Sequence, residues 1–209
     1  MAQKSKAPTI AILDYGMGNL SSVYKALSYL GARPVITSSP ATASRAAKLI
    51  LPGVGAFGDA MQELNQRKLA APIREHIQKG KKFLGICLGL QLLFEKSEES
   101  KGVKGLCVFK GKSRHFKTKL AKVPHMGWNQ LKTIQKHPVL DKITPKDFFY
   151  FVHSYHPVAQ KENQLASCEH GKEVFTAIAG NQNAVAVQFH PEKSQEPGLR
   201  LLKNFIRWS

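Results

Sequence analysis

The sequence has few acidic residues, few cysteines and no long apolar run. Its 14 Asp and Glu residues stand against 31 Lys and Arg residues, which gives a formal net charge of +17 at pH 7. No segment approaches the roughly 18 consecutive apolar residues that a membrane span needs, so we expect no membrane association. The three cysteines are odd in number and widely spaced. This argues against a disulfide framework and predicts a reducing, cytoplasmic setting.

The chain also lacks the marks of a leader or a second domain. Residues 1–8 are basic but pass directly into a short strand-like segment. A signal peptide needs an apolar core and a small-residue cleavage site, and we expect none here. No repeat, low-complexity stretch or linker interrupts the sequence, so we predict one domain over residues 1–209.

The positive charge has three possible explanations, which are nucleic acid, an acidic partner protein or solubility. The densest basic run covers residues 110–122, with Phe116 as its one interior aromatic residue. This run matches no nucleic-acid-binding motif, so we expect no nucleic-acid partner.

The first half of the chain alternates apolar runs with segments of helical periodicity. Strands are expected at 9–14, 34–37, 48–51 and 83–86. Helices are expected at 20–30, at 41–47, over 57–79 with a break near Pro72, and directly after residue 87. This order predicts an α/β fold, with an open, mostly parallel sheet flanked by helices on both faces.

The second half changes to a strand-rich pattern. Further strands, antiparallel in part, are expected at 106–109, 130–134, 148–153, 165–169, 174–179 and 184–189. An amphipathic helix over residues 197–208 closes the chain.

Three glycine-rich turns, at 15–19, 52–55 and 85–89, follow expected strands. Ligands of open α/β sheets bind beyond the carboxyl ends of the strands, so we expect these turns to converge on one cleft. The first turn is similar to a dinucleotide fingerprint, but Ser21 stands where the third glycine belongs. A nucleotide site is therefore not predicted.

The third turn contains Gly-x-Cys-x-Gly, the thiol form of a nucleophile elbow. Gly85 and Gly89 remove side chains where the turn folds against its own strand and helix. Cys87 then projects above the sheet at the positive end of a helix, which favours a thiolate. Taken alone, Cys87 also fits a small buried apolar residue. Gln91 lies one helical turn further and is expected to bond its neighbours or a substrate.

An acyl-transfer site also needs N–H donors that face the developing oxyanion. The amide of Leu88, directly after the nucleophile, supplies one such donor. The amide of Val54 or Gly55 supplies the other, because Gly53 and Gly55 allow the backbone between them to reorient.

A base and an orienting acid follow near the end of the chain. His190 and Glu192 project to the same side of an extended chain, and Pro191 restrains the backbone between them. With Cys87 they complete a nucleophile, base and acid. His153 and His156 have no further ligand at zinc spacing nearby, so we expect them to hydrogen-bond at a strand end and predict no metal site.

Together these residues resemble the class I, triad-type glutamine amidotransferases. Within that class they are most similar to the glutaminase subunits of imidazole glycerol phosphate synthases. The stretches that carry the resemblance are 14–20, 52–58, 85–94, 124–129, 150–155 and 188–194. The class fold is flavodoxin-like.

The resemblance implies an activity and its residues. Cys87 would attack the side-chain amide of glutamine, His190 would shuttle protons and Glu192 would orient the imidazole. Substrate would be held by Gln91 and by the backbone of Ser154 and Tyr155. No cofactor is expected. The family works as a heterodimer with a (β/α)8-barrel cyclase that consumes the ammonia in histidine biosynthesis. The positions that match its interface are Asn19, Trp128 and Lys193.

Three alternatives stay open from the sequence. Paralogous amidotransferases feed ammonia to other acceptors, such as sugar precursors. A cysteine hydrolase of the same fold would share the elbow. An inactive binding subunit would not need the intact triad residues.

Overall fold

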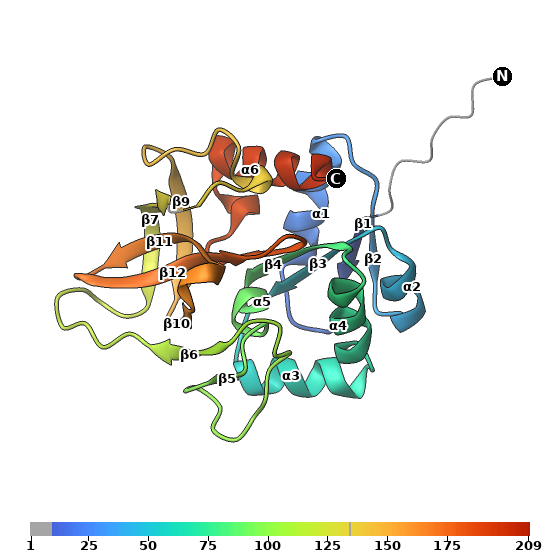
Figure 1. Cartoon of the computed structure of the whole chain (residues 1–209), viewed down its shortest axis with the longest axis horizontal. Helices are drawn as coiled ribbons and strands as arrows, with labels where there is room; N and C mark the ends of the chain where they lie inside the picture. The colour runs from blue at the N-terminus through green and yellow to red at the C-terminus, as the bar shows by residue number, and fades with distance from the viewer. Residues whose placement is uncertain (1–9, 134) are drawn as a thin grey trace.

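The computed structural model describes residues 10–133 and 135–209. The expectations for residues 1–9 and for Ile134 lie outside this part of the chain. A central eight-stranded sheet has the order β2-β1-β3-β4-β13-β12-β11-β8 (Figure 1). It is accompanied by a three-stranded sheet, β10-β6-β5, and a two-stranded sheet, β7-β9.

The first five strands of the central sheet are mutually parallel. They are β2 (Pro34–Thr37), β1 (Ile10–Leu13), β3 (Lys48–Gly53), β4 (Lys82–Cys87) and β13 (Ala184–Val187). Three antiparallel strands extend the sheet, namely β12 (Glu173–Gly180), β11 (Gln164–His170) and β8 (Lys132–Thr133). The predicted mostly parallel α/β sheet is therefore confirmed, as are its antiparallel additions.

The smaller sheets lie beside the carboxyl ends of the parallel strands. Their strands are β5 (Lys96–Ser97), β6 (Gly111–His115), β7 (His125–Gln130), β9 (Phe148–His153) and β10 (Tyr155–Ala159). The helices are α1 (Leu20–Tyr29), α2 (Pro40–Arg45), α3 (Phe57–Gln66), α4 (Ala70–Gln78), α5 (Leu88–Gln91) and α6 (Gln195–Arg207). The 3₁₀ turns in the described part of the chain are η1 (Pro138–Leu140), η2 (Lys161–Asn163) and η3 (Pro191–Lys193).

Two hydrophobic cores form because successive residues of a strand point to opposite faces of the sheet. Ile10 and Ile12 of β1 face the core that α1 and α6 cover. Ala11 and Leu13 face the other core, under α2, α3 and α4. Figure 1 shows α6 and α1 on one side of the sheet and α3 and α4 on the other. The parallel strands are buried on both faces, which explains their continuous apolar runs.

The structure corrects two of the expected strands and refines two of the expected helices. Residues 106–109 form no strand, although Leu106 and Phe109 are buried, because their amides bond the carbonyls of Leu92 and Leu93 in a loop. The helical region expected over 57–79 has the expected break, but the break lies at residues 67–69, and Pro72 is in the first turn of the second helix, where a missing N–H is tolerated. The helix expected directly after residue 87 is present and is four residues long. The strand expected at 130–134 is divided between β7 and β8.

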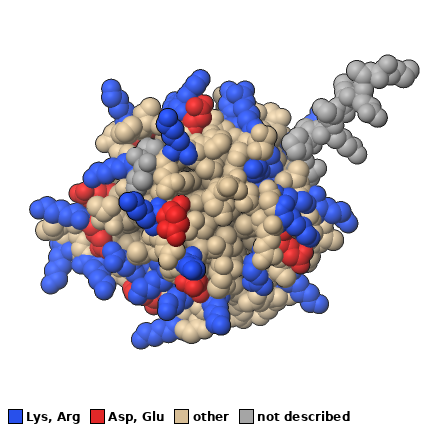
Figure 2. Space-filling model, in the orientation of Figure 1, with Lys and Arg blue, Asp and Glu red and all other residues tan. Residues whose placement is uncertain are grey.

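The positive charge does not gather in one place on the face seen in Figure 2. Lys and Arg side chains spread over that whole face, with the acidic residues between them. Within residues 10–133 and 135–209, no helix has the length and apolar character to cross a membrane.

Candidate active site

Cys87 lies at the tip of a strained strand-to-helix turn. Its backbone adopts φ 55° and ψ −109°, a conformation that a residue with a side chain rarely takes. Such strain persists only where the surroundings enforce it, and it is concentrated at functional sites. A methyl group at Gly85 would lie 2.7 Å from the Gly89 carbonyl oxygen, and one at Gly89 would overlap the carbonyl oxygen of Leu51. Both glycines are therefore required by close packing, as predicted.

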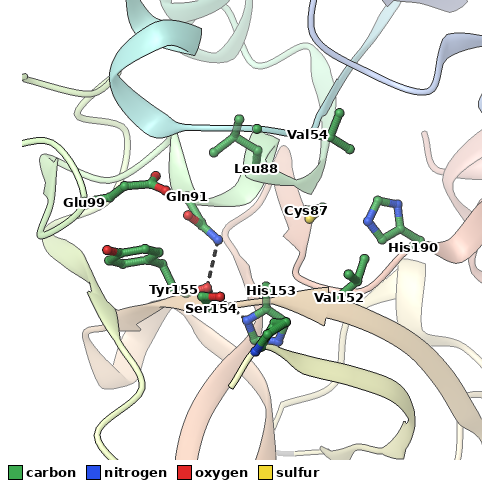
Figure 3. A pocket seen from close by; sticks show the side chains of 12 residues that line it. Val54, Cys87, Leu88, Gln91, Glu99, Val152, His153, Ser154, Tyr155 and His190 are labelled. Atoms are coloured by element: carbon green, nitrogen blue, oxygen red, sulfur yellow. Dashed lines mark hydrogen bonds between the residues drawn. The ribbon is translucent and has the colours of Figure 1, made fainter. Parts of the chain in front are cut away.

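Cys87 opens into a cavity of about 400 Å³, a size suited to a small ligand. Cys87 is buried, at 6% exposure. Figure 3 shows the Cys87 sulfur between Gln91 and His190, with Val54 and Leu88 on one side and Ser154 and Tyr155 on the other. The cavity thus joins the second and third glycine-rich turns to the end of β9.

The first glycine-rich turn does not line this cavity. The turn packs behind the cavity instead, since the Tyr15 hydroxyl lies where a side chain on Gly53 would be. Tyr15 is 1% exposed, and burial raises the pKa of its hydroxyl. The expected convergence of three turns on one cleft is therefore correct for two of them.

His190 and Glu192 form a buried pair beside Cys87. His190 Nδ1 and Glu192 Oε1 are 2.8 Å apart, and their side chains are 3% and 1% exposed. The backbone between them is the 3₁₀ turn η3, not the extended chain that we expected. The turn still brings both side chains together, and Ser194 Oγ fixes it by donating to the His190 carbonyl.

The charge state of His190 follows from its neighbours. Burial by itself lowers the pKa of His190, but interactions with Cys87 and Glu192 favour the imidazolium and raise the pKa to about 10. A carboxylate on Nδ1 also fixes the ring so that Nε2 is directed to the cavity. The pair can therefore hold a proton next to the sulfur and deliver it to a leaving group.

The predicted oxyanion residues lie in the same cavity, apart from Gly53. Val54, Gly55 and Leu88 all line it, and Val54 is 43% exposed. Gly55 has φ +98°, which favours glycine. Gly53 pairs with Cys87 in the ladder between β3 and β4. Its role is thus to let β3 pack against the elbow and Tyr15.

Gln91 is buried and uses both N–H groups inside the protein. Its Nε2 donates to the Tyr155 carbonyl at 2.9 Å and to Gln188 Oε1 at 3.3 Å (Figure 3 shows the first). Only the Gln91 side-chain carbonyl remains for a ligand. Gln188 in turn donates from Nε2 to Cys87 Sγ at 3.8 Å. Sequence reasoning missed Gln188 as a site residue, although it lies in the stretch that carries His190.

A second missed residue is Glu99, which lines the cavity. Its Oε2 accepts from the Phe57 amide at the start of α3, at 2.7 Å. Ser154 and Tyr155 line the opposite wall, as predicted. No sequence signal pointed to Glu99, because it is brought to the cavity only by the loop that follows β5.

The three residues assigned to a partner interface differ in their surroundings. Trp128 on β7 is 47% exposed, so it is not a core tryptophan. Lys193 is exposed, and its Nζ lies 6.0 Å from the Tyr150 ring centroid. Asn19 caps α1, where its side chain accepts from the Ser22 amide. Met126 and Phe148 extend the exposed apolar surface around Trp128, at 63% and 49% exposure.

Comparison with known proteins defines the class of this enzyme. The family model described as "Glutamine amidotransferase class-I" matches residues 11–208. The fold is similar to that in "Structure of PurLQS from Thermotoga maritima", with a TM-score of 0.76, 19% identity, and 97% and 99% coverage of the two chains. The chain belongs to the class I glutamine amidotransferase family.

Within this family, two relatives of one kind match the chain over nearly its whole length. It is 48% identical over 203 residues to the imidazole glycerol phosphate synthase subunit HisH of Trichormus variabilis, covering 95% of each chain. It is 50% identical over 197 residues to the subunit of the same name from Aquifex aeolicus, covering 94% of this chain and 95% of that one.

Proposed function

We propose that this protein is the glutaminase subunit of an imidazole glycerol phosphate synthase and hydrolyses glutamine to glutamate and ammonia. The observation that carries the proposal is the strained Cys87 in one cavity with the buried His190–Glu192 pair. The relatives at 48% and 50% identity over nearly the whole chain support the particular subunit.

The reaction begins when the Cys87 sulfur, as thiolate, attacks the side-chain amide carbon of glutamine. The carbonyl oxygen becomes an oxyanion, which the amides of Leu88 and of Val54 or Gly55 stabilise. The tetrahedral intermediate collapses, the C–N bond breaks and His190 gives its proton to the departing ammonia. A glutamyl thioester remains.

The second half of the reaction releases glutamate. His190, now neutral, takes a proton from water as the water attacks the thioester carbon. The C–S bond then breaks and the sulfur leaves as thiolate, while the imidazolium is restored. Glu192 keeps the ring oriented through both steps and stabilises its positive charge.

The cavity walls suit the two ends of a free amino acid. Glu99 offers Oε1 to the α-ammonium group, since its Oε2 is held by Phe57. The Gln91 carbonyl and the backbone of Ser154 and Tyr155 hold the remaining polar groups of the substrate.

The ammonia is passed to a (β/α)8-barrel cyclase, which docks over the carboxyl ends of the strands. Trp128 supplies an exposed apolar anchor for this partner, and Lys193 follows the orienting acid directly and pairs with an acidic residue on the barrel. Asn19 lies at the same interface. We place the pair in the cytoplasm, where its free thiol persists.

Substitution of Cys87 by alanine tests the assignment. With the cyclase present, Cys87→Ala abolishes glutamine-dependent synthesis and leaves ammonia-dependent synthesis nearly intact, because external ammonia bypasses the thiol. The measurement is product formation with each nitrogen source. Comparable glutamine hydrolysis by the variant would sink the triad assignment, and turnover of peptides by the native chain would favour a cysteine hydrolase.

We also expect the isolated subunit to turn over little glutamine. Glycines on both sides of Val54 let its amide rotate between two orientations, and only one of them completes the oxyanion site. Removal of one oxyanion donor lowers kcat by about 10²–10³, so stimulation of this order is expected when cyclase and its ligand are added. Equal rates with and without them would refute gating.

A further inference from the structure

A continuous series of hydrogen bonds leads from the catalytic cavity through buried histidines to Asn129 near the surface. At the cavity it starts with Gln188, which donates to the Cys87 sulfur and accepts from Gln91. Gln91 donates its other N–H to the Tyr155 carbonyl. Neither amide can be turned around, because a backbone carbonyl only accepts and therefore requires the Gln91 N–H. The Tyr155 carbonyl thus fixes which group of each glutamine faces the cavity.

The same carbonyl also accepts from His153, which lines the cavity, and His125 lies behind His153. His153 Nδ1 lies 2.9 Å from the Tyr155 carbonyl oxygen, so this nitrogen carries the proton and Nε2 accepts. His153 Nε2 lies 3.1 Å from His125 Nδ1, which must donate. His125 Nε2 then accepts from Asn129 Nδ2 at 3.1 Å, and the second Asn129 N–H goes to the Glu169 carbonyl. With both rings neutral, each hydrogen bond between the Tyr155 carbonyl and Asn129 therefore has only one possible donor.

Burial keeps both rings in the form that this direction needs. His125 is 4% exposed and His153 is 6% exposed. Burial lowers the pKa of His125 to about 4, with the neighbouring His170 adding to the effect. Burial also lowers the pKa of His153 well below its ordinary value, with His125 as a further cause. Both rings are therefore neutral near pH 7.

The two histidines are paired across β7 and β9, which are themselves brought together in the folded chain. His125 is further fixed by its neighbours, since it stacks on Phe151 and His170 with centroids 4.7 and 4.2 Å away. The fixed His125 ring in turn holds His153, which bonds the Tyr155 carbonyl. The arrangement thus resembles the outer groups that orient ligands at other sites.

We propose that His125 and His153 are positioning residues for glutamine hydrolysis. His125 holds His153, and His153 holds the Tyr155 carbonyl. Through this carbonyl they direct the Gln91 carbonyl toward the substrate and the Gln188 N–H toward the Cys87 sulfur. This proposal rests on the proposed function. His125 does not line the cavity, so it acts on substrate binding through His153, Tyr155 and Gln91.

Two variants of His125 separate this role from a merely structural one. In His125→Asn the side-chain amide takes the place of Nδ1 and can still donate to His153. In His125→Phe the stacked ring is kept but the donor is lost. His125→Gln also lacks a donor at the Nδ1 position and replaces the Phe variant if that variant fails to fold. His76→Phe is the matched control, because it removes a buried imidazole hydrogen bond far from the cavity, to the Lys82 carbonyl.

Glutamine hydrolysis is measured with the cyclase and its ligand bound, with KM and kcat determined separately. His125→Phe is expected to raise KM for glutamine about tenfold, the effect of losing one buried hydrogen bond, with a smaller change in kcat. His125→Asn should restore KM to within about twofold, and His76→Phe should leave it unchanged. Equal KM values for the Asn and Phe variants would overturn the positioning role.

A second measurement does not depend on activity. Nitrogen-15 NMR of the folded chain at pH 7 is expected to show His125 and His153 as neutral rings with the proton on Nδ1. A proton on Nε2, or an imidazolium at either residue, would overturn the proposed direction of the chain. If the native complex does not hydrolyse glutamine at all, the proposed function fails, while the NMR result still decides the hydrogen-bond order.

Discussion

Acid should destabilise this protein through His125. The unfolded chain binds a proton at this residue near the ordinary pKa of about 6.5. In the folded chain, burial lowers that pKa to about 4. Between these values the unfolded state holds more protons, so the free energy of unfolding falls as pH falls. The contribution of His125 is fully present above pH 6.5 and is lost on the way to pH 4.

The magnitude follows from the size of the shift. One pKa unit corresponds to about 1.4 kcal/mol, so the full difference amounts to roughly 3 kcal/mol, of which about 2 kcal/mol is lost between pH 7 and pH 5. His153 acts in the same direction, because burial lowers its pKa as well. A total of 5–15 kcal/mol is usual for a domain, so this loss is a large share of the stability.

Urea unfolding at pH 7 and pH 5 measures the effect. The native chain should lose more stability than His125→Phe over this interval, because the variant has no group to titrate at that position. The difference between the two losses should be about 2 kcal/mol. Equal losses in both proteins would show that His125 is not held neutral by burial and would refute the reasoning.

Two further substitutions test the close packing and the interface. Gly89→Ala should lower the free energy of unfolding in urea by about 3 kcal/mol, because its methyl group meets the Leu51 carbonyl. The control is Gly18→Ala, whose methyl group has ordinary contacts with Pro52 at 3.5 Å. An equal loss of stability in the two variants would contradict the packing argument. Trp128→Ala should weaken cyclase binding by ~2 kcal/mol, about 30-fold in Kd, while the free subunit unfolds within ~0.5 kcal/mol of the native chain. A loss of ~3–5 kcal/mol in the free subunit would instead identify a core role.

Part of the fold could be predicted from the sequence, because glycine spacing and apolar runs reflect close packing and burial. Gly85 and Gly89 flank Cys87 in a turn that tolerates no side chain at either glycine, because a methyl group there would overlap the backbone. The continuous apolar runs at the parallel strands indicated that these strands are buried on both faces of the sheet. The strands β6 and β10 escaped prediction, since their residues are mixed in polarity and their burial alternates irregularly.

The turn between His190 and Glu192 shows a prediction that was right for a partly wrong reason. An extended chain and a 3₁₀ turn both bring these two side chains to one side here. Sequence spacing alone does not distinguish them, because Pro191 fits either backbone.

The sequence by itself indicated the alternation of strands and helices in the α/β sheet and the Gly-x-Cys-x-Gly turn, because these patterns depend on residues close together along the chain. Only the tertiary structure decided that Glu99 enters the cavity, that Gln188 reaches the Cys87 sulfur and that His125 stands behind His153. Gln188 and Cys87 are 101 residues apart in sequence. Such contacts depend on how whole strands register with one another, and burial then forces each polar group to find its partner there.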